Sequence, residues 1–136
     1  MISKIVVGTD TSAAADLAVK TAAELARAHQ AEMLVVYVKP VMAARDVFDP
    51  KKAPDPARYL GGIPGRFPDV RTRTREASGD AAETISQVAA EERADIIVVG
   101  NRGTRDRRRS FLSSVPAALL RQAPASVLVV DTRVAH

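Results

Sequence analysis

Three groups of residues in this chain of 136 have the types and spacing to bind a small anionic ligand. The run Thr9-Asp10-Thr11-Ser12 follows one short apolar segment, and Gly100-Asn101-Arg102-Gly103 follows another. Ser113 and Ser114 come next, where a helix is expected to begin. Glycine-rich turns and helix starts present backbone amides to phosphate, while the Asp10 carboxylate can accept hydrogen bonds from a ribose hydroxyl or an adenine amino group. Together these groups predict a nucleotide site.

Each group also has a plain structural explanation. A Gly-x-x-Gly sequence after a buried strand occurs in ordinary turns, and Asp10 can cap the helix that follows it. Ser113 or Ser114 can cap a later helix in the same way. The stretch from Arg102 to Arg109, with five Arg and one Asp, is compatible with a solvated loop. The nucleotide interpretation is favoured because all these groups fall at one end of the same expected sheet.

The elements that would position these residues start with four short strands. Runs rich in β-branched residues at 5–8, 33–38, 96–100 and 127–130 do not alternate, which is expected for strands covered on both faces. The segment 70–75 alternates strictly between arginine and smaller residues. It is predicted as an edge strand, because charge discourages edge-to-edge pairing.

Helical spacing of apolar residues separates these strands. Strands that alternate with helices predict one α/β domain with a parallel sheet and helices on both faces. Ligands of such sheets bind beyond the carboxyl ends of the strands. The expected helices are 12–29 with Ser12 as N-cap, 81–92 with Asp80 and Glu83 as a capping box, and 115–122 with Ser113 or Ser114 as cap and Pro116 in the first turn.

Residues 40–69 interrupt this alternation. They contain six of the eight prolines in the chain, together with Gly61, Gly62 and Gly65. We expect a long connection there, with one short helix around residues 57–60.

Composition excludes several classes of site. The chain has no cysteine, which rules out disulfides and thiolate ligands and fits the cytoplasm. His29 and His136 have no partners spaced for catalysis or metal binding, and the phosphate-loop and dinucleotide signatures are absent. No apolar run approaches the roughly 20 residues of a membrane span, and we expect no signal peptide.

The charge is concentrated in one place. The net charge of the chain is +4, and the stretch from Arg102 to Arg109 alone carries the same excess. Its position between Gly100 and Ser113 points to a polyphosphate, with a nucleic-acid surface as an alternative. Nucleic acid is disfavoured because the chain has few aromatic residues for a stacking platform. These are Tyr37, Phe48, Tyr59, Phe67 and Phe111.

The order and spacing of these segments resemble the universal stress protein family. The resemblance covers nearly all of residues 1–136 as a single domain, and residues 40–69 match least well. It implies an adenine nucleotide alpha hydrolase-like fold, with five parallel strands in the order 3-2-1-4-5, and a homodimer formed through Val127–Asp131. The segments that carry it are Ile5–Ser12, Gly79-Asp80, Ala94–Gly103, Ser113–Val115 and Ala123–Val130.

The resemblance also implies site residues. ATP-binding members carry G-x-x-G, nine residues, and then G-[ST]; this chain keeps the spacing but has Ser113 in place of the second-block glycine. Gly8, Thr9 and Asp10 would face the ribose and adenine, Val38 would contact adenine through its backbone, Gly100, Arg102 and Gly103 would approach the phosphates, and Ser113, Ser114 and Val115 would close the phosphate site.

The expected function is therefore binding of ATP, with or without Mg²⁺, or of a related adenine nucleotide, in a cytoplasmic regulatory dimer of the stress response. No catalytic residue and no metal ligand are predicted. Any ATP hydrolysis is expected to be slow, because the sequence offers no positioned general base. The alternative is a family member without nucleotide that acts as a dimeric protein-interaction module. Ser113 motivates this alternative.

Overall fold

The structure is a computed structural model that describes residues 1–39, 55–101 and 110–131, the last range without the side chains of residues 110–114. Strands and helices alternate along most of the chain, as the apolar pattern predicts. The elements are β1 (Lys4–Thr9), α1 (Ala13–His29), β2 (Glu32–Lys39), α2 (Pro56–Gly61), α3 (Ile63–Arg66), β3 (Arg71–Ser78), α4 (Ala81–Glu92), β4 (Ile96–Gly100), α5 (Ser110–Gln122) and β5 (Ser126–Val130).

The strands form one parallel sheet in the order β3-β2-β1-β4-β5, which confirms the predicted topology. β1 lies in the centre and pairs with β2 from Lys4↔Glu32 to Thr9↔Tyr37. On its other side it pairs with β4, where Val7 lies opposite Val98. β3 and β5 are the two edge strands, as predicted.

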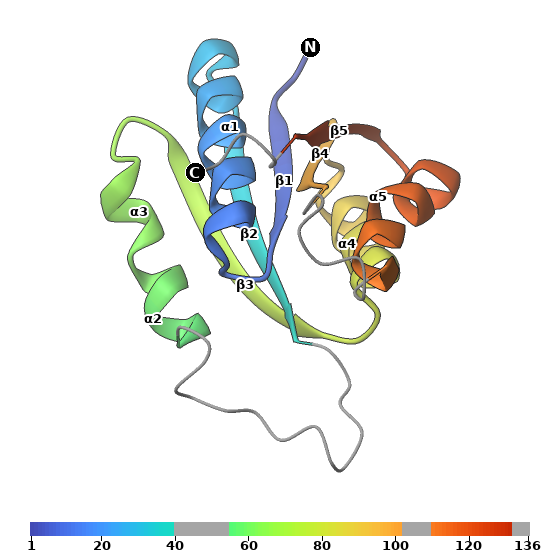
Figure 1. Cartoon of the computed structure of the whole chain (residues 1–136). Coiled ribbons are helices and arrows are strands. Elements are labelled where there is room, and N and C mark those ends of the chain that lie inside the picture. Colours follow the sequence, from blue (N-terminus) through green and yellow to red (C-terminus); the bar gives the residue numbers. More distant parts are fainter. Residues whose placement is uncertain (40–54, 102–109, 132–136) are drawn as a thin grey trace.

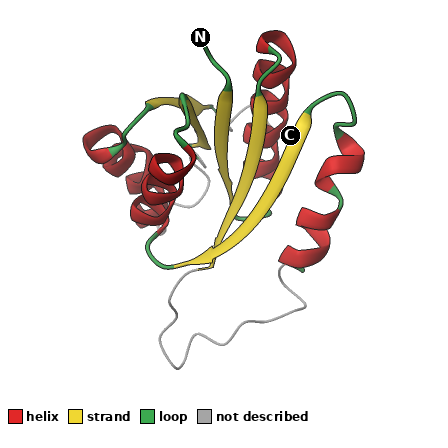
Figure 2. Ribbon diagram, turned by 180° about the vertical axis from the view of Figure 1, so that it is seen from behind, coloured by secondary structure: helices red, strands yellow, loops and turns green. Residues whose placement is uncertain are grey.

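Helices cover both faces of the sheet (Figures 1 and 2). On one face, α1, α2 and α3 bury a cluster that contains Ile5, Val7, Met33 and Val35. On the other face, α4 and α5 pack on the alternate residues of the same strands. Successive side chains of a strand point to opposite faces, so both faces of β1 and β2 must be apolar. This explains the unbroken apolar runs in the sequence.

Local capping sets the start of two helices as predicted. The hydroxyl of Ser12 accepts a hydrogen bond of 3.0 Å from the Ala15 amide at the start of α1. The carboxylate of Asp80 accepts one of 3.0 Å from the Glu83 amide at the start of α4. Both caps bond amides that the helix leaves without an internal partner.

The start of α5 differs from the prediction. The helix begins at Ser110, so Ser113 and Ser114 lie within it and are not its cap. Pro116 lies in the helix interior and not in the first turn. An interior proline removes one backbone hydrogen bond. The buried residue Leu119 packs α5 on the sheet, and its burial helps to offset that loss.

The connection before β3 contains one more helix than predicted. Asp55 caps α2, and α3 follows directly after Gly62. Pro64 and Gly65 suggest a break in the helical structure, but Pro64 lies at the start of α3, where its missing N–H has no helical partner to lose. Leu60 and Ile63 are buried and hold this pair of short helices on the sheet.

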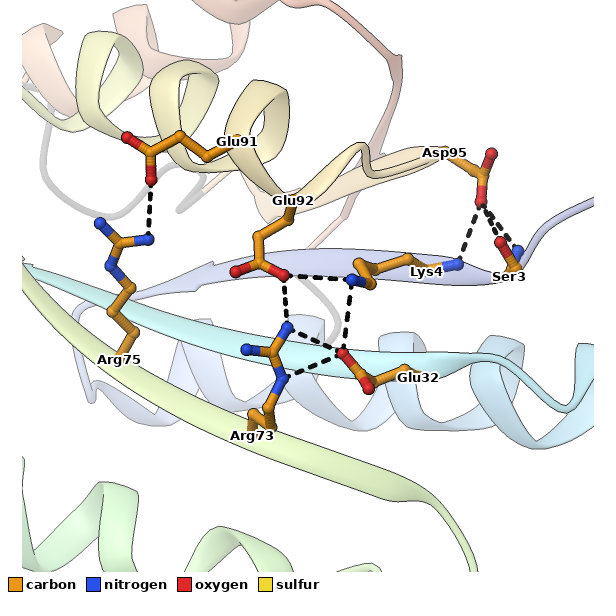
Figure 3. Close-up of polar contacts among 8 residues, drawn as sticks. All are labelled: Ser3, Lys4, Glu32, Arg73, Arg75, Glu91, Glu92 and Asp95. Carbon is orange, nitrogen blue, oxygen red and sulfur yellow. Dashed lines mark hydrogen bonds and ion pairs between the residues drawn. The ribbon is translucent and has the colours of Figure 1, made fainter.

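Charged residues tie β3 to its neighbours on the α4 side of the sheet (Figure 3). Arg73 of β3 bonds Glu32 of β2 and Glu92 of α4, and Lys4 of β1 also bonds Glu92, at 3.1 Å. Arg75 bonds Glu91 at 3.1 Å. This network lies away from the carboxyl ends of the strands, where the candidate ligand residues lie.

Candidate functional site

The candidate site lies at the carboxyl ends of β1, β2 and β4, and the ends of β1 and β2 point toward the lower part of Figure 1. The chain leaves β1 toward β2 on one side and later returns to β4 on the other, so the order of strands reverses at β1. Open parallel sheets bind ligands in the crevice at such a reversal. The structure therefore brings the residues predicted at the ends of these three strands to the same end of the sheet.

The turn between β1 and α1 is held by its own polar side chains. The Thr9 hydroxyl accepts a hydrogen bond of 2.9 Å from the Thr11 amide. The Asp10 carboxylate accepts one of 2.9 Å from the Ser12 amide. Thr11 has a φ of 69°, which is uncommon for a β-branched residue, and it is buried. The turn thus holds Asp10 in one backbone conformation, exposed at the carboxyl end of β1.

Gly8 has a packing role in this structure. A β-carbon at this position would lie 2.6 Å from Cδ1 of Ile85 in α4. The absence of a side chain therefore lets α4 approach the end of β1 closely. Packing against α4 therefore accounts for a glycine at this position.

Val38 and Gly100 lie near the ends of the strands that flank β1. Val38 is the last residue but one of β2 and is paired with Ala77 of β3. Gly100 ends β4 and is paired with Val130 of β5. The next residue, Asn101, donates its amide to the Val130 carbonyl at 3.0 Å. The start of the β4–α5 connection is therefore attached to the end of β5.

The predicted phosphate residues are described only in part. Arg102, Gly103 and the rest of the stretch to Arg109 lie outside the described residues. Ser113 and Ser114 belong to the backbone of α5. Val115 is half-buried against the cluster between the sheet and α4 and α5.

One residue at this end of the sheet was not predicted as part of the site. Tyr37 lies opposite Thr9 in the sheet. Burial raises the pKa of its phenol, and the negative charges of Asp10 and Glu76 raise it further. Tyr37 is thus close enough to Asp10 to sense its charge. The sequence signal was its position next to Val38, but an aromatic residue in an apolar run indicates core packing first.

A second set of unpredicted residues joins α1 to α2 and α3. The guanidinium of Arg66 donates two hydrogen bonds to Asp16, of 2.7 and 2.9 Å, and the Tyr59 hydroxyl donates a third. Partial burial would raise the pKa of Asp16, but these hydrogen bonds and the positive charges of Arg66 and Lys20 together outweigh it and lower the pKa. In the sequence, Asp16 is only an acidic residue in a first helical turn, and Tyr59 lies in a segment without periodicity.

The described residues present the Asp10 carboxylate, a hydrogen-bond acceptor, at this end of the sheet. Among residues 1–39, 55–101 and 110–131, no group of three or more His, Cys, Asp or Glu side chains could hold a metal ion. In the same ranges, no helix has the length and apolar character to cross a membrane. The arrangement suits recognition of a polar organic ligand by the exposed Asp10 carboxylate and the strand ends.

Comparison with known proteins agrees with this geometry. A model of the universal stress protein family matches residues 1–131. The chain belongs to the universal stress protein family. A universal stress protein of Synechocystis is 30% identical over 135 residues, which cover 96% of this chain and 86% of that protein. The fold is accordingly that of the adenine nucleotide alpha hydrolase-like proteins.

Solved structures of other universal stress proteins have the same architecture. One, solved in complex with cAMP, has a TM-score of 0.76 and 26% identity and covers 96% of this chain and 97% of its own. Another, the universal stress protein UspA of Lactobacillus plantarum, has a TM-score of 0.73 and 25% identity, with 94% and 97% coverage.

Proposed function

We propose that this universal stress protein binds ATP or a related adenine nucleotide at the carboxyl ends of β1, β2 and β4. The observation that carries the proposal is the β1–α1 turn, which holds the exposed Asp10 carboxylate where the strand order reverses. A similar universal stress protein was solved in complex with cAMP, which supports an adenine nucleotide as the ligand.

The described residues fit the nucleoside part of such a ligand. A carboxylate recognises ribose hydroxyls or the adenine amino group, and Asp10 presents one at the strand ends. Gly8 and Thr9 lie beside it at the end of β1, and the backbone of Val38 lies at the end of β2. Gly100, Arg102, Gly103, Ser113, Ser114 and Val115 are proposed for the phosphates on the spacing of their motif.

The proposed role is binding rather than turnover. We propose that the nucleotide regulates a homodimer in the cytoplasm during stress, with at most slow hydrolysis of ATP, and that any Mg²⁺ is bound together with the phosphates. A nucleic-acid partner and a membrane are not part of this proposal.

The proposed dimer forms through β5. Leu128 is 37% exposed, and Val127 and Val129 are half-buried. Antiparallel pairing of two such strands about Leu128 would place Leu128 opposite its own copy and Val127 opposite Val129. Apolar cross-strand pairs of this kind stabilise a sheet, and the pairing would also cover the open edge of β5.

Calorimetric titration tests nucleotide binding. Wild-type protein is titrated with ATP in the presence of magnesium, and with cAMP. The Asp10→Ala variant is expected to bind about tenfold or more weakly, because a hydrogen bond to a charged group is lost. The matched control is Asp69→Ala, which removes another exposed carboxylate at the opposite end of α1. Wild-type protein that binds neither nucleotide at millimolar concentration would contradict the proposal.

The alternative is a dimeric interaction module that has lost the nucleotide. Ser113 favours it, because this residue replaces the glycine of the motif in ATP-binding members. The Ser113→Gly variant separates the two functions. If only the variant binds ATP, the alternative holds; if the wild-type protein already binds as tightly, it fails.

A further inference from the structure

We propose that Asn101, held by the end of β5, connects the proposed dimer to the proposed nucleotide site, with Asp131 as a positioning residue. Asn101 directly follows Gly100 at the end of β4. Asp131 directly follows Val130 at the end of β5. The inference rests on the proposed nucleotide binding and the proposed dimer, and it names the contacts through which each would affect the other.

Two hydrogen bonds attach Asn101 to the end of β5. Its backbone amide donates to the Val130 carbonyl at 3.0 Å. Its side-chain Nδ2 donates to the Asp131 carboxylate at 3.4 Å. A carboxylate only accepts hydrogen bonds, so the nitrogen of the Asn101 side chain, and not its oxygen, must face Asp131. Together the two bonds fix the backbone of Asn101 and the orientation of its side chain.

Asn101 lies beside residues that are proposed to bind the nucleotide. It adjoins Gly100, which is proposed for the phosphates. In the sheet, Val98 of β4 lies opposite Val7 of β1. Asn101 comes three residues after Val98, and Asp10 comes three residues after Val7. Both therefore stand at the carboxyl ends of neighbouring strands, and a shift of Asn101 moves the start of the proposed phosphate site.

The backbone of β5 presents alternate residues to its two sides. In a strand, the amide and the carbonyl of one residue point to one side, and those of the next residue point to the other. The Val130 carbonyl points to β4, because it accepts the Asn101 amide. The backbone groups of Val129 therefore point to the open edge, where a second copy would bond them. The second copy and Asn101 would thus hold adjacent residues of β5 from opposite sides.

The end of β5 is the element whose state both partners would change. β5 is an edge strand paired with β4, and the ends of such strands open more readily than strands paired on both sides. When this end opens, Asn101 loses the two hydrogen bonds described above, and the start of the phosphate site loses its fixed position. A second copy favours the closed end, and so does a nucleotide that needs Gly100 and Asn101 in place. Each therefore strengthens the binding of the other by the same factor.

The test compares two variants of Asp131. Asp131→Ala removes the acceptor of the Asn101 side chain, and Asp131→Asn is the matched control, because its amide oxygen can still accept that hydrogen bond. Both variants remove the negative charge, so a difference between them reports the hydrogen bond. Exchange of the Asn101 amide, measured by NMR, is expected to be about threefold faster in Asp131→Ala than in Asp131→Asn, because one partly exposed hydrogen bond is lost.

Sedimentation equilibrium with and without saturating ATP and magnesium measures the coupling between the two sites. In the wild-type protein and in Asp131→Asn, ATP is expected to lower the dissociation constant of the dimer about fivefold or more. In Asp131→Ala, this factor is expected to fall to about twofold or less, because Asn101 is then held by its backbone bond without the side-chain bond.

Equal factors in all three proteins would overturn the inference, and so would equal exchange of the Asn101 amide in the two variants. It is also overturned if calorimetry shows ATP bound to the wild-type protein while the dissociation constant of the dimer stays the same. A wild-type protein that binds no ATP contradicts the proposed function instead. The link between the dimer and Asn101 is then decided by the Asn101 amide, whose exchange must slow as rising protein concentration forms the dimer; exchange that is independent of concentration overturns it.

Discussion

The two edge strands of the sheet, β3 and β5, differ in how they resist pairing with another chain. β3 alternates arginine with smaller residues, which places Arg71, Arg73 and Arg75 on one face. Two of these arginines bond glutamates of β2 and α4 (Figure 3). β5 has the sequence SVLVV, with no charged residue, and its Leu128 is partly exposed.

The same symmetric pairing would have opposite results at the two edges. Antiparallel pairing of two β3 strands about Arg73 would set Arg73 against its own copy and Arg71 against Arg75, and like charges opposite each other are destabilising. Pairing about Leu128 would set only apolar residues and Ser126 against their partners. The contrast favours β5 over β3 as the strand that receives a second copy.

The largest effect is expected from Leu128→Arg. At the centre of the proposed interface, two arginines would face each other across the twofold axis, and we expect the dissociation constant of the dimer to rise about a hundredfold. Sedimentation equilibrium measures this constant. Thr74→Arg on β3 adds the same charge to the other edge and is expected to leave it unchanged. A dimer of wild-type affinity in Leu128→Arg would exclude β5 as the interface.

At acid pH, we expect the β3 amides to lose more protection from hydrogen exchange than the β5 amides. Hydrogen bonds from Arg73 and Lys4 lower the pKa of Glu92 from its ordinary value of 4.5. Because the folded pKa is the lower one, this stabilisation is complete above about pH 4.5 and is lost as the pH falls through the folded value. β5 has no titratable side chain that would respond in this way.

Hydrogen exchange at neutral pH and at about pH 3, corrected for intrinsic rates, measures this difference. Protection of the β3 amides should fall more than that of the β5 amides. The Glu92→Gln variant should begin with weaker protection of β3 and lose less of it in acid. Equal losses in the two strands of the wild-type protein would show that the charged network does not stabilise β3.

The smallest effect is expected from Arg93→Gly. Arg93 ends α4 with a φ of 55° and is exposed. Glycine adopts this conformation without steric strain, so we expect the free energy of unfolding to rise by about 0.5 kcal/mol. Urea denaturation measures it. The gain should appear in the exchange of α4 and β3, because Glu91 and Glu92 of α4 bond the β3 arginines. Lower stability than wild type would mean that the side chain of Arg93 contributes more than its strain costs.

Much of the fold could be predicted from local patterns. Short apolar runs indicated the strands, and Ser12 and Asp80 indicated helix starts, because these features depend on residues a few positions apart. The predicted start of α5 was wrong because it also relied on local features alone. Two serines before a proline have the local features of a cap, but the helix begins three residues before the first of them, at Ser110. The pair α2–α3 lacks a long apolar period, so its second helix was missed.

The candidate site was predictable where it follows the strands. Thr9, Asp10, Val38 and Gly100 come at strand ends, and parallel strands bring their carboxyl ends together. The cluster of Asp16, Tyr59 and Arg66 was not predictable, because Asp16 is separated from Tyr59 by 43 positions and from Arg66 by 50. No periodicity links such residues.

The sequence by itself therefore determined the alternation of strands and helices, the apolar faces and the motif residues, because each depends on short-range spacing. The tertiary structure decided which polar residues meet. Arg66 and Tyr59 both bond Asp16 only because α2 and α3 pack beside α1 on the same face of the sheet (Figure 1). The donor–acceptor distance of a hydrogen bond can vary by only a few tenths of an ångström, and only the packing of the helices places these side chains that accurately.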